Sequence, residues 1–186
     1  MDGGLPAVGR NNAARAGLGD NLLFLDADIV LPDGFLERSL EEFHRRGLGC
    51  ATTDYVPMSE RRFDRAAFAM YNGFARLTQR VEPIAAGFCI FTTRDAFDNV
   101  DGFDPTVKLG EDFDFIKRCA QHDEFGILHT HILYDVRRLE KEGRWRLARK
   151  YLTGYVYRLA NGEMHDVPFD YVLQGDVNVR TGKKET

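Results

Sequence analysis

The sequence predicts an α/β fold in which helices cover a sheet of buried strands. The continuous apolar run from Leu22 to Leu25 is typical of a strand that is buried on both faces. Between Arg61 and Arg80, apolar side chains instead recur at steps of three and four, which is the spacing of an amphipathic helix. Strand-like and helix-like segments alternate in this way along the chain, and this alternation favours a layered α/β domain.

The expected elements follow one another with short connections. Helices are expected over residues 5–18, from Pro32 to about residue 46, over 61–80, over 112–122, and from the basic segment that starts at 137 to about 161. Strands are expected over 22–25, 50–53, 87–93 and 125–131. Proline is tolerated in a first helical turn, and Gly162 is a suitable residue to follow the last helix.

Length and composition limit the classes of protein that fit. A chain of 186 residues is long enough for one domain with a substantial core. We expect that domain over residues 1–162, with a C-terminal extension over 163–186 whose end is frayed. The net charge of −4 argues against a nucleic-acid partner. The three cysteines show no metal-ligand spacing and are expected to be reduced thiols in a cytoplasmic protein.

Two carboxylates follow the first buried strand. Asp26 and Asp28 are separated by one residue, so in extended backbone they point to the same side. Ligands of open α/β sheets bind at this edge, and a hard cation such as Mg²⁺ or Mn²⁺ would relieve the repulsion between the two carboxylates. The alternative is that these aspartates only begin a turn or cap the next helix.

A second acidic cluster lies at Glu111, Asp112 and Asp114, after the turn Gly102-Phe103-Asp104-Pro105. Acidic residues are common in a first helical turn, where they favour the helix dipole. An apolar wall can also raise the pKa of a carboxylate and suit it to act as a general base, which makes Asp112 a candidate for that role.

The order of these segments resembles glycosyltransferase family 2. The segment Asn11-Asn12-Ala13-Ala14-Arg15 is similar to the family's Ala-Arg-Asn-x-Gly helix with an altered order, and Asp26-Ala27-Asp28 is similar to its Asp-x-Asp motif. Ala86-Gly87-Phe88 resembles the segment that lines the acceptor pocket. Val100-Asp101-Gly102-Phe103-Asp104 is similar to the Gly-Gly-Phe-Asp turn, with Asp101 in place of the first glycine. Gly110-Glu111-Asp112 matches the Glu-Asp motif.

The resemblance implies a GT-A fold, which is a three-layer α/β/α sandwich with a mixed sheet. It implies inverting transfer of a sugar from a nucleotide-diphosphate-sugar donor to a hydroxyl of a saccharide or lipid-linked acceptor. Asp112 would be the base, and Glu111 would orient the acceptor. Asp26, Asp28, Arg15 and Arg138 would bind the donor diphosphate, and Mn²⁺ or Mg²⁺ would be held by Asp26, Asp28 and His131.

Some of these assignments have open alternatives. His129 and His131 share a face of the predicted strand, and both fit ordinary strand-end histidines as well as they fit a metal ligand. The basic run from Arg137 to Lys150 is interpreted mainly as a solvated helix face. An interfacial helix at the inner face of a membrane and a homodimer also remain open.

The family's earlier nucleoside-binding motifs are not found before the Asn11 segment, so the domain is expected to be incomplete and its isolated activity is in question.

A haloacid dehalogenase-like phosphatase with Asp26 as nucleophile is one alternative. A module that binds without catalysis is another. A glycosidase has no stronger support, and an EF-hand is disfavoured because Leu31 occupies the position that requires glycine.

Overall fold

The computed structural model describes residues 6–165, 172–173 and 177–178 of the chain. Helices and strands alternate along most of it, as expected. The helices are α1 (Pro6–Ala16), α2 (Phe35–Arg45), α3 (Arg62–Thr78), α4 (Arg94–Asn99), α5 (Glu111–Cys119), α6 (Arg137–Glu142) and α7 (Arg144–Asn161). The strands are β1 (Asn21–Leu25), β2 (Ile29–Val30), β3 (Cys50–Pro57), β4 (Cys89–Thr93), β5 (Phe125–Tyr134), β6 (Val172–Leu173) and β7 (Val177–Asn178).

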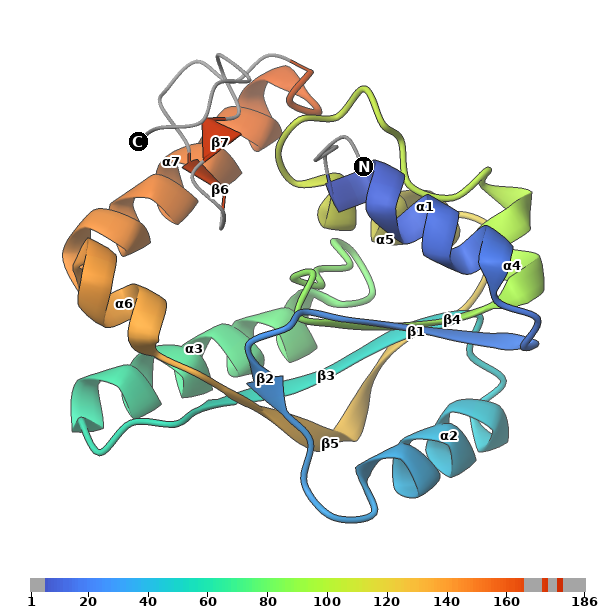
Figure 1. The fold of residues 1–186 in the computed structure, drawn as a ribbon, viewed down its shortest axis with the longest axis horizontal. Helices are drawn as coiled ribbons and strands as arrows, with labels where there is room; N and C mark the ends of the chain where they lie inside the picture. Colours follow the sequence, from blue (N-terminus) through green and yellow to red (C-terminus); the bar gives the residue numbers. More distant parts are fainter. Residues whose placement is uncertain (1–5, 166–171, 174–176, 179–186) are drawn as a thin grey trace.

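Five strands form a mixed sheet in the order β1-β4-β3-β5-β2. Strand β3 is parallel to β5, and the other pairs are antiparallel. Helix α2 lies on one side of this sheet, and α1, α3, α4 and α5 lie on the other (Figure 1). This arrangement confirms the expected α/β fold with a mixed sheet. The C-terminal extension expected over 163–186 falls mostly outside the described residues, so its frayed end stays a prediction.

Two apolar clusters hold the helices to the sheet. Phe24 of β1 packs with Phe97, Phe103 and Phe115, whose rings come from α4, α5 and the loop between them. The second cluster contains Phe35 and Phe43 of α2 together with residues of β3, β4 and β5. Leu22 and Phe24 are both buried, as the apolar run over β1 predicts, although β1 is an edge strand of the described sheet.

Two features of the helices differ from the expectation. Helix α4 was not expected; it begins where the Thr93 side chain accepts a hydrogen bond from the backbone N–H of Ala96. The basic segment forms two helices, α6 and α7, because Gly143 between them has a φ of 87°, a conformation that favours glycine. Within the described residues, no helix is long and apolar enough to cross a membrane.

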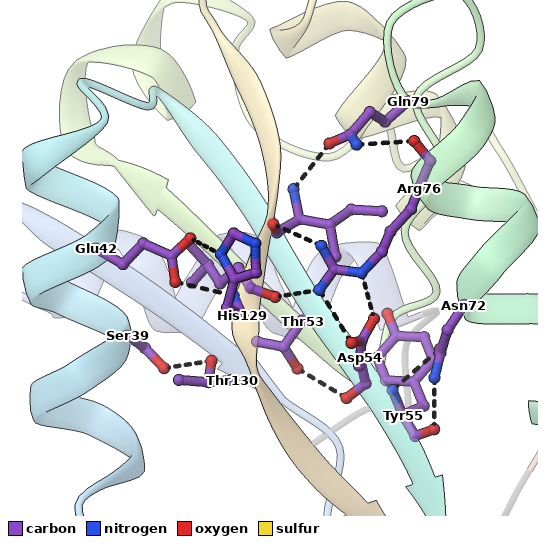
Figure 2. Close-up of polar contacts among 12 residues, drawn as sticks. Ser39, Glu42, Thr53, Asp54, Tyr55, Asn72, Arg76, Gln79, His129 and Thr130 are labelled. Atoms are coloured by element: carbon purple, nitrogen blue, oxygen red, sulfur yellow. Dashed lines mark hydrogen bonds and ion pairs between the residues drawn. The ribbon is translucent and has the colours of Figure 1, made fainter. Parts of the chain in front are cut away.

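The pairing of β3 with β5 is interrupted, and side chains replace the missing ladder bonds. The register shifts between Thr52 and Asp54, opposite residues 128–130. Arg76 of α3 donates to the carbonyl oxygens of Ile127 and Leu128 at 3.4 and 2.7 Å and also binds Asp54. From the other face, Glu42 of α2 accepts from the backbone N–H of His129 at 2.8 Å (Figure 2). Side chains from both helix layers therefore stabilise this irregularity.

Replacing Arg76 with alanine is expected to destabilise the protein by about 3 kcal/mol, because it removes the ion-pair partner of the partly buried Asp54 and a donor to the carbonyl oxygen of Leu128. Arg65 on the same helix provides a matched control, since its ion pair with Glu60 is exposed and is worth about 0–1 kcal/mol. Urea unfolding of both variants measures the difference. Equal stability of the two variants would show that Arg76 does not stabilise the irregular pairing of β3 and β5.

Candidate active site

The segment from Asp26 to Asp28 connects the two opposite edges of the sheet. Strand β1 ends at Leu25 at one edge, and β2 begins at Ile29 at the other, although the two strands are consecutive in the chain (Figure 1). The backbone N–H of Asp26 donates to Phe88 before β4, at 3.3 Å. The carbonyl oxygen of Asp28 accepts from the N–H of Asp135, just after β5, at 3.2 Å. Both aspartates are thus fixed at ends of strands.

Arg10 of α1 connects Asp26 to the second acidic cluster. One guanidinium nitrogen of Arg10 donates to the Glu111 carboxylate at 2.6 Å, and the other donates to Asp26 at 3.3 Å. The second nitrogen also lies 3.5 Å from the carbonyl oxygen of Gly87. The side chains of Arg10 and Glu111 are largely buried, at 17% and 12% exposure. A single cation therefore compensates two carboxylates that are 85 positions apart in the sequence (26 to 111).

Asp112 is held by backbone donors at the first turn of α5. Its two carboxylate oxygens accept from the N–H of Phe113 at 2.9 Å and from the N–H of Gly87 in a short bond of 2.5 Å. Gly110 precedes the helix with a φ of 81°, so a residue without a side chain allows the sharp entry that turns the acids inward. Asp112 thereby reaches the same loop that contacts Arg10.

Burial raises the pKa values of three acids of this site, and neighbouring negative charges add to the shift for two of them. Burial raises the pKa of Asp26, and the charges of Asp28 and Asp112 act in the same direction, whereas Arg10 lowers it. Burial also raises the pKa of Asp112, against the effect of Arg10. Burial and the Asp112 charge raise the pKa of Glu111 to about 7, and Arg10 again opposes the shift. The four carboxylates and one guanidinium therefore form a single electrostatic unit.

Helix α1 is positioned by a reciprocal pair of hydrogen bonds. The buried Asn11 side chain donates to the carbonyl oxygen of Phe103 at 2.7 Å and accepts from its N–H at 2.9 Å. The turn before Phe103 has positive φ values of 57° at Asp101 and 69° at Gly102. Aspartate tolerates this region better than most residues, which explains how Asp101 can stand at a position where glycine is usual. The turn thus fixes the helix that carries Arg10.

A family model described as glycosyl transferase family 2 matches residues 4–100, which is more than half of the 186-residue chain. The chain belongs to glycosyl transferase family 2. Because the chain belongs to this family, the alternative of a phosphatase with Asp26 as nucleophile is set aside. No curated protein matches the sequence.

Solved glycosyltransferase structures of the GT-A type share the fold. A mannosyltransferase from Pyrobaculum calidifontis, solved with GDP-Man and Mn²⁺, is 18% identical with a TM-score of 0.59 over 84% of this chain and 44% of that one. Residues 1–349 of S. aureus TarS are 14% identical with a TM-score of 0.55 over 72% of this chain and 41% of that one. The chain therefore spans less than half the length of these two structures.

The structure places the remaining predicted residues of this family 2 domain outside the acidic cluster. Arg15 is exposed in the last turn of α1. Arg138 donates to Glu142 at 2.8 Å within α6. Arg10, and not Arg15, contacts the acidic cluster. The stretch Gly9-Arg10-Asn11-Asn12-Ala13 contains the Arg-Asn order of the motif, and this order is the signal that the sequence reasoning missed.

His131 is not brought together with the two aspartates. Strand β2 pairs Val30 with Leu133, so Asp28 lies beside Asp135, whereas His131 lies further back along β5. There it lines a surface hollow of about 320 Å³ with His129 and residues of α2. In the described part of the chain, no three His, Cys, Asp or Glu side chains are grouped to hold a metal ion. The expected set of Asp26, Asp28 and His131 is therefore not assembled.

Asp26 and Asp28 alone still fit a divalent cation that arrives with its substrate. Mg²⁺ is usually bound by one or two carboxylates, with phosphate oxygens and water completing its coordination. Asp26 and Asp28 lie close enough for the charge on Asp28 to raise the pKa of Asp26, so a cation between them would relieve an existing repulsion. The donor set suits Mg²⁺ or Mn²⁺, which prefer oxygen ligands.

Gly87 is expected to be essential for this arrangement. A Cβ atom at Gly87 would lie 2.5 Å from a guanidinium nitrogen of Arg10 and 3.2 Å from a carboxylate oxygen of Asp112. Gly87→Ala should therefore separate Arg10 from Asp112 and lower the activity of any enzyme site built on this cluster by about tenfold or more, since a misplacement of about 1 Å can cost 10²-fold. The control is Gly73→Ala in α3, where a Cβ meets no atom within 4 Å. Equal activity of both variants would contradict this role.

Proposed function

We propose that this chain carries the metal-binding and acceptor-side site of a glycosyltransferase that moves a sugar from a nucleotide-diphosphate donor to a hydroxyl group. The observation that carries the proposal is the Arg10 bridge between Asp26 and Glu111. This bridge joins the end of β1, which leads to Asp26 and Asp28, to the start of α5, which carries Asp112. The two carboxylates proposed to bind a cation and the carboxylate proposed as the base therefore face the same region. Family membership sets the reaction class.

Asp112 is proposed as the base of an inverting transfer. Its carboxylate would accept the proton of the acceptor hydroxyl as the oxygen bonds to the anomeric carbon and the bond from that carbon to the donor phosphate breaks. The departing group is the nucleoside diphosphate. Burial raises the pKa of Asp112 above its ordinary value, which increases its proton affinity, and the charge of Arg10 opposes this shift.

Arg10 and Glu111 are proposed to position that base. The Arg10 guanidinium lies between two acids, packs 5.3 Å from the centre of the Phe103 ring, and is anchored through α1. Its charge lowers the pKa values of Asp26, Glu111 and Asp112. Glu111 in turn fixes the orientation of the guanidinium by a 2.6 Å hydrogen bond.

Asp26 and Asp28 are proposed to hold Mn²⁺ or Mg²⁺ together with the donor diphosphate. When bound, such a cation neutralises the charge that develops on the leaving diphosphate. The mannosyltransferase of similar fold was solved with GDP-Man and Mn²⁺, which supports the choice of a guanosine diphosphate sugar and Mn²⁺ as the first probes.

Titration calorimetry with GDP-mannose and UDP-glucose, each with and without Mn²⁺, tests this proposal. We expect heat of binding that requires Mn²⁺ and that disappears in Asp26→Asn/Asp28→Asn. The control is Asp95→Asn/Asp98→Asn, two exposed acids of α4. Metal-independent binding, or equal binding by both double variants, would overturn the role of the aspartates. Binding without any turnover of the donor would favour the non-catalytic module.

A further inference from the structure

Helix α3 presents an apolar stripe that nothing in the described structure covers. Phe63, Met70, Phe74 and Leu77 follow one another at steps of seven, four and three, so they lie on one face of the helix. Met70 is 75% exposed and Leu77 is 84% exposed. The sheet side of the same helix is anchored by Asn72 and other residues, so this stripe points away from the sheet.

Helix α7 carries a second exposed apolar stripe. Trp145, Leu152 and Val156 lie at steps of seven and four, and Trp145 is 76% exposed. The rings of Trp145 and Phe63 are 5.2 Å apart, so the two stripes meet at this pair. Together they form one apolar surface across two helices, which we call the α3–α7 surface. Exposed apolar patches rimmed by polar residues mark interaction sites.

Exposed arginines adjoin the α3–α7 surface, although the whole chain has a net charge of −4. Helix α7 has the sequence RWRLARKYLTGYVYRLAN and contains no acidic residue. Arg146 and Arg149 beside Trp145, and Arg62 beside Phe63, are exposed. None of the three forms an ion pair with another described residue. Tryptophan with aliphatic and unpaired arginine side chains is the combination that favours the headgroup region of a bilayer.

We propose that the α3–α7 surface binds the surface of a membrane that contains anionic lipids. The apolar stripes would enter the headgroup region, and Arg62, Arg146 and Arg149 would contact lipid phosphates. Each arginine near the lipid headgroups contributes about 1 kcal/mol of favourable binding free energy to an anionic membrane surface. In a symmetric dimer through the same surface, these arginines would face one another and repel, which favours lipid over a second copy of the chain.

Helix α7, which carries half of the α3–α7 surface, also contacts the residue that follows the candidate base. Arg158 in the C-terminal half of α7 is buried and packs over the ring of Phe113 at 4.8 Å from its centre, and Phe113 follows Asp112. The membrane would therefore lie along the helix that also packs against α5. The inference stands on the α3–α7 surface alone and does not depend on the proposed transfer reaction.

Trp145 is the only tryptophan of the chain, so its fluorescence reports on this surface directly. The probe is a set of vesicles of phosphatidylcholine, with or without phosphatidylglycerol. We expect a blue shift of the emission and quenching by brominated acyl chains, only with phosphatidylglycerol present, and both weakened by salt. Unchanged emission with anionic vesicles would overturn the proposal. A blue shift that grows with protein concentration before any lipid is added would also overturn it, in favour of self-association.

A charge-reversal pair makes the test specific to the surface. Arg146→Glu/Arg149→Glu should weaken partition into anionic vesicles by at least about tenfold. Arg38→Glu/Arg45→Glu places the same change on exposed positions of α2, on the opposite side of the sheet, and should retain most of the binding. Equal losses in both variants would show a non-specific charge effect and overturn the assignment to α7. Donor titration on the same proteins reports separately on the site.

Discussion

Replacing Asp112 with asparagine is expected to lower sugar transfer, or hydrolysis of the donor by water, by about 10²–10⁴-fold, because the amide cannot accept the acceptor's proton. Metal-dependent binding of the donor should persist, since Asp26 and Asp28 are unchanged. Steady-state turnover of the sugar nucleotide and titration calorimetry measure the two effects separately. A turnover number that falls with an unchanged dissociation constant identifies a group used in the chemical step.

Two controls make this result interpretable. Asp112 accepts from Gly87 and Phe113 with different oxygens, so the asparagine amide will face one N–H donor and cost about 1–3 kcal/mol of stability. Thermal unfolding must show that the variant is folded at the assay temperature. Asp95→Asn removes an exposed acid from the first turn of the neighbouring helix α4 and should retain activity. Full activity of Asp112→Asn would exclude Asp112 as the base.

Replacing Arg10 with alanine is expected to lower the free energy of unfolding by about 3 kcal/mol near neutral pH. Glu111 would remain buried beside Asp112 without its cation, and the loss of one partner of a buried pair typically costs 3–5 kcal/mol. Donor turnover should fall as well, because Asp112 and Asp26 lose the positive charge that lowers their pKa values. Arg15→Ala, five residues along the same helix, removes an exposed arginine and should change stability by less than about 0.5 kcal/mol.

The stability deficit of Arg10→Ala should depend on pH. With Arg10 present, burial and the charge of Asp112 already raise the pKa of Glu111 to about 7, and removing Arg10 raises it further. An acid with a raised pKa in the folded state favours folding at low pH, and this contribution is lost as pH rises through that pKa. The deficit should therefore be small near pH 5 and larger near pH 8. A deficit that is constant over this range would show that Glu111 does not carry the effect.

The order of elements could be predicted because each depends on local pattern. The apolar run before Asp26 predicts β1, and the spacing of apolar residues predicts α3 within two residues at each end. Local pattern fails at Gly143. The basic, periodic segment predicts one helix, but the positive φ of Gly143 divides it into α6 and α7. The short helix α4 depends on a cap by Thr93 and has too few residues for a periodic signal.

The proximity of the two acidic clusters could be inferred from the sequence, but not the residue that connects them. Arg10 and Arg15 flank the face of α1 formed by Ala7, Asn11 and Ala14 on opposite sides, so helical spacing does not choose between them. The choice depends on which side of α1 faces Glu111, and the turn at Phe103 decides it by binding Asn11. Such long-range contacts have no local signal.

The position of His131 was unpredictable for a related reason. Alternation along β5 predicts that His129 and His131 share a face, and both line the hollow beside α2 although the register shifts opposite Thr52–Asp54. His129 instead binds Glu42 of α2 at 2.7 Å. Both histidines therefore face α2 across the irregular step in the pairing of β3 and β5, and no local pattern shows which helix covers that face.

The same irregular step has a consequence for exchange of backbone protons with solvent. The amide hydrogens of Ile127 and His129 are held by the side chains of Gln79 and Glu42, at 3.2 and 2.8 Å, rather than by a neighbouring strand. A change of side-chain rotamer is enough to release them, whereas the amides of a regular ladder open only when strands separate. In deuterium these two amides should exchange ahead of the rest of the central sheet, and should do so singly rather than as one cooperative unit.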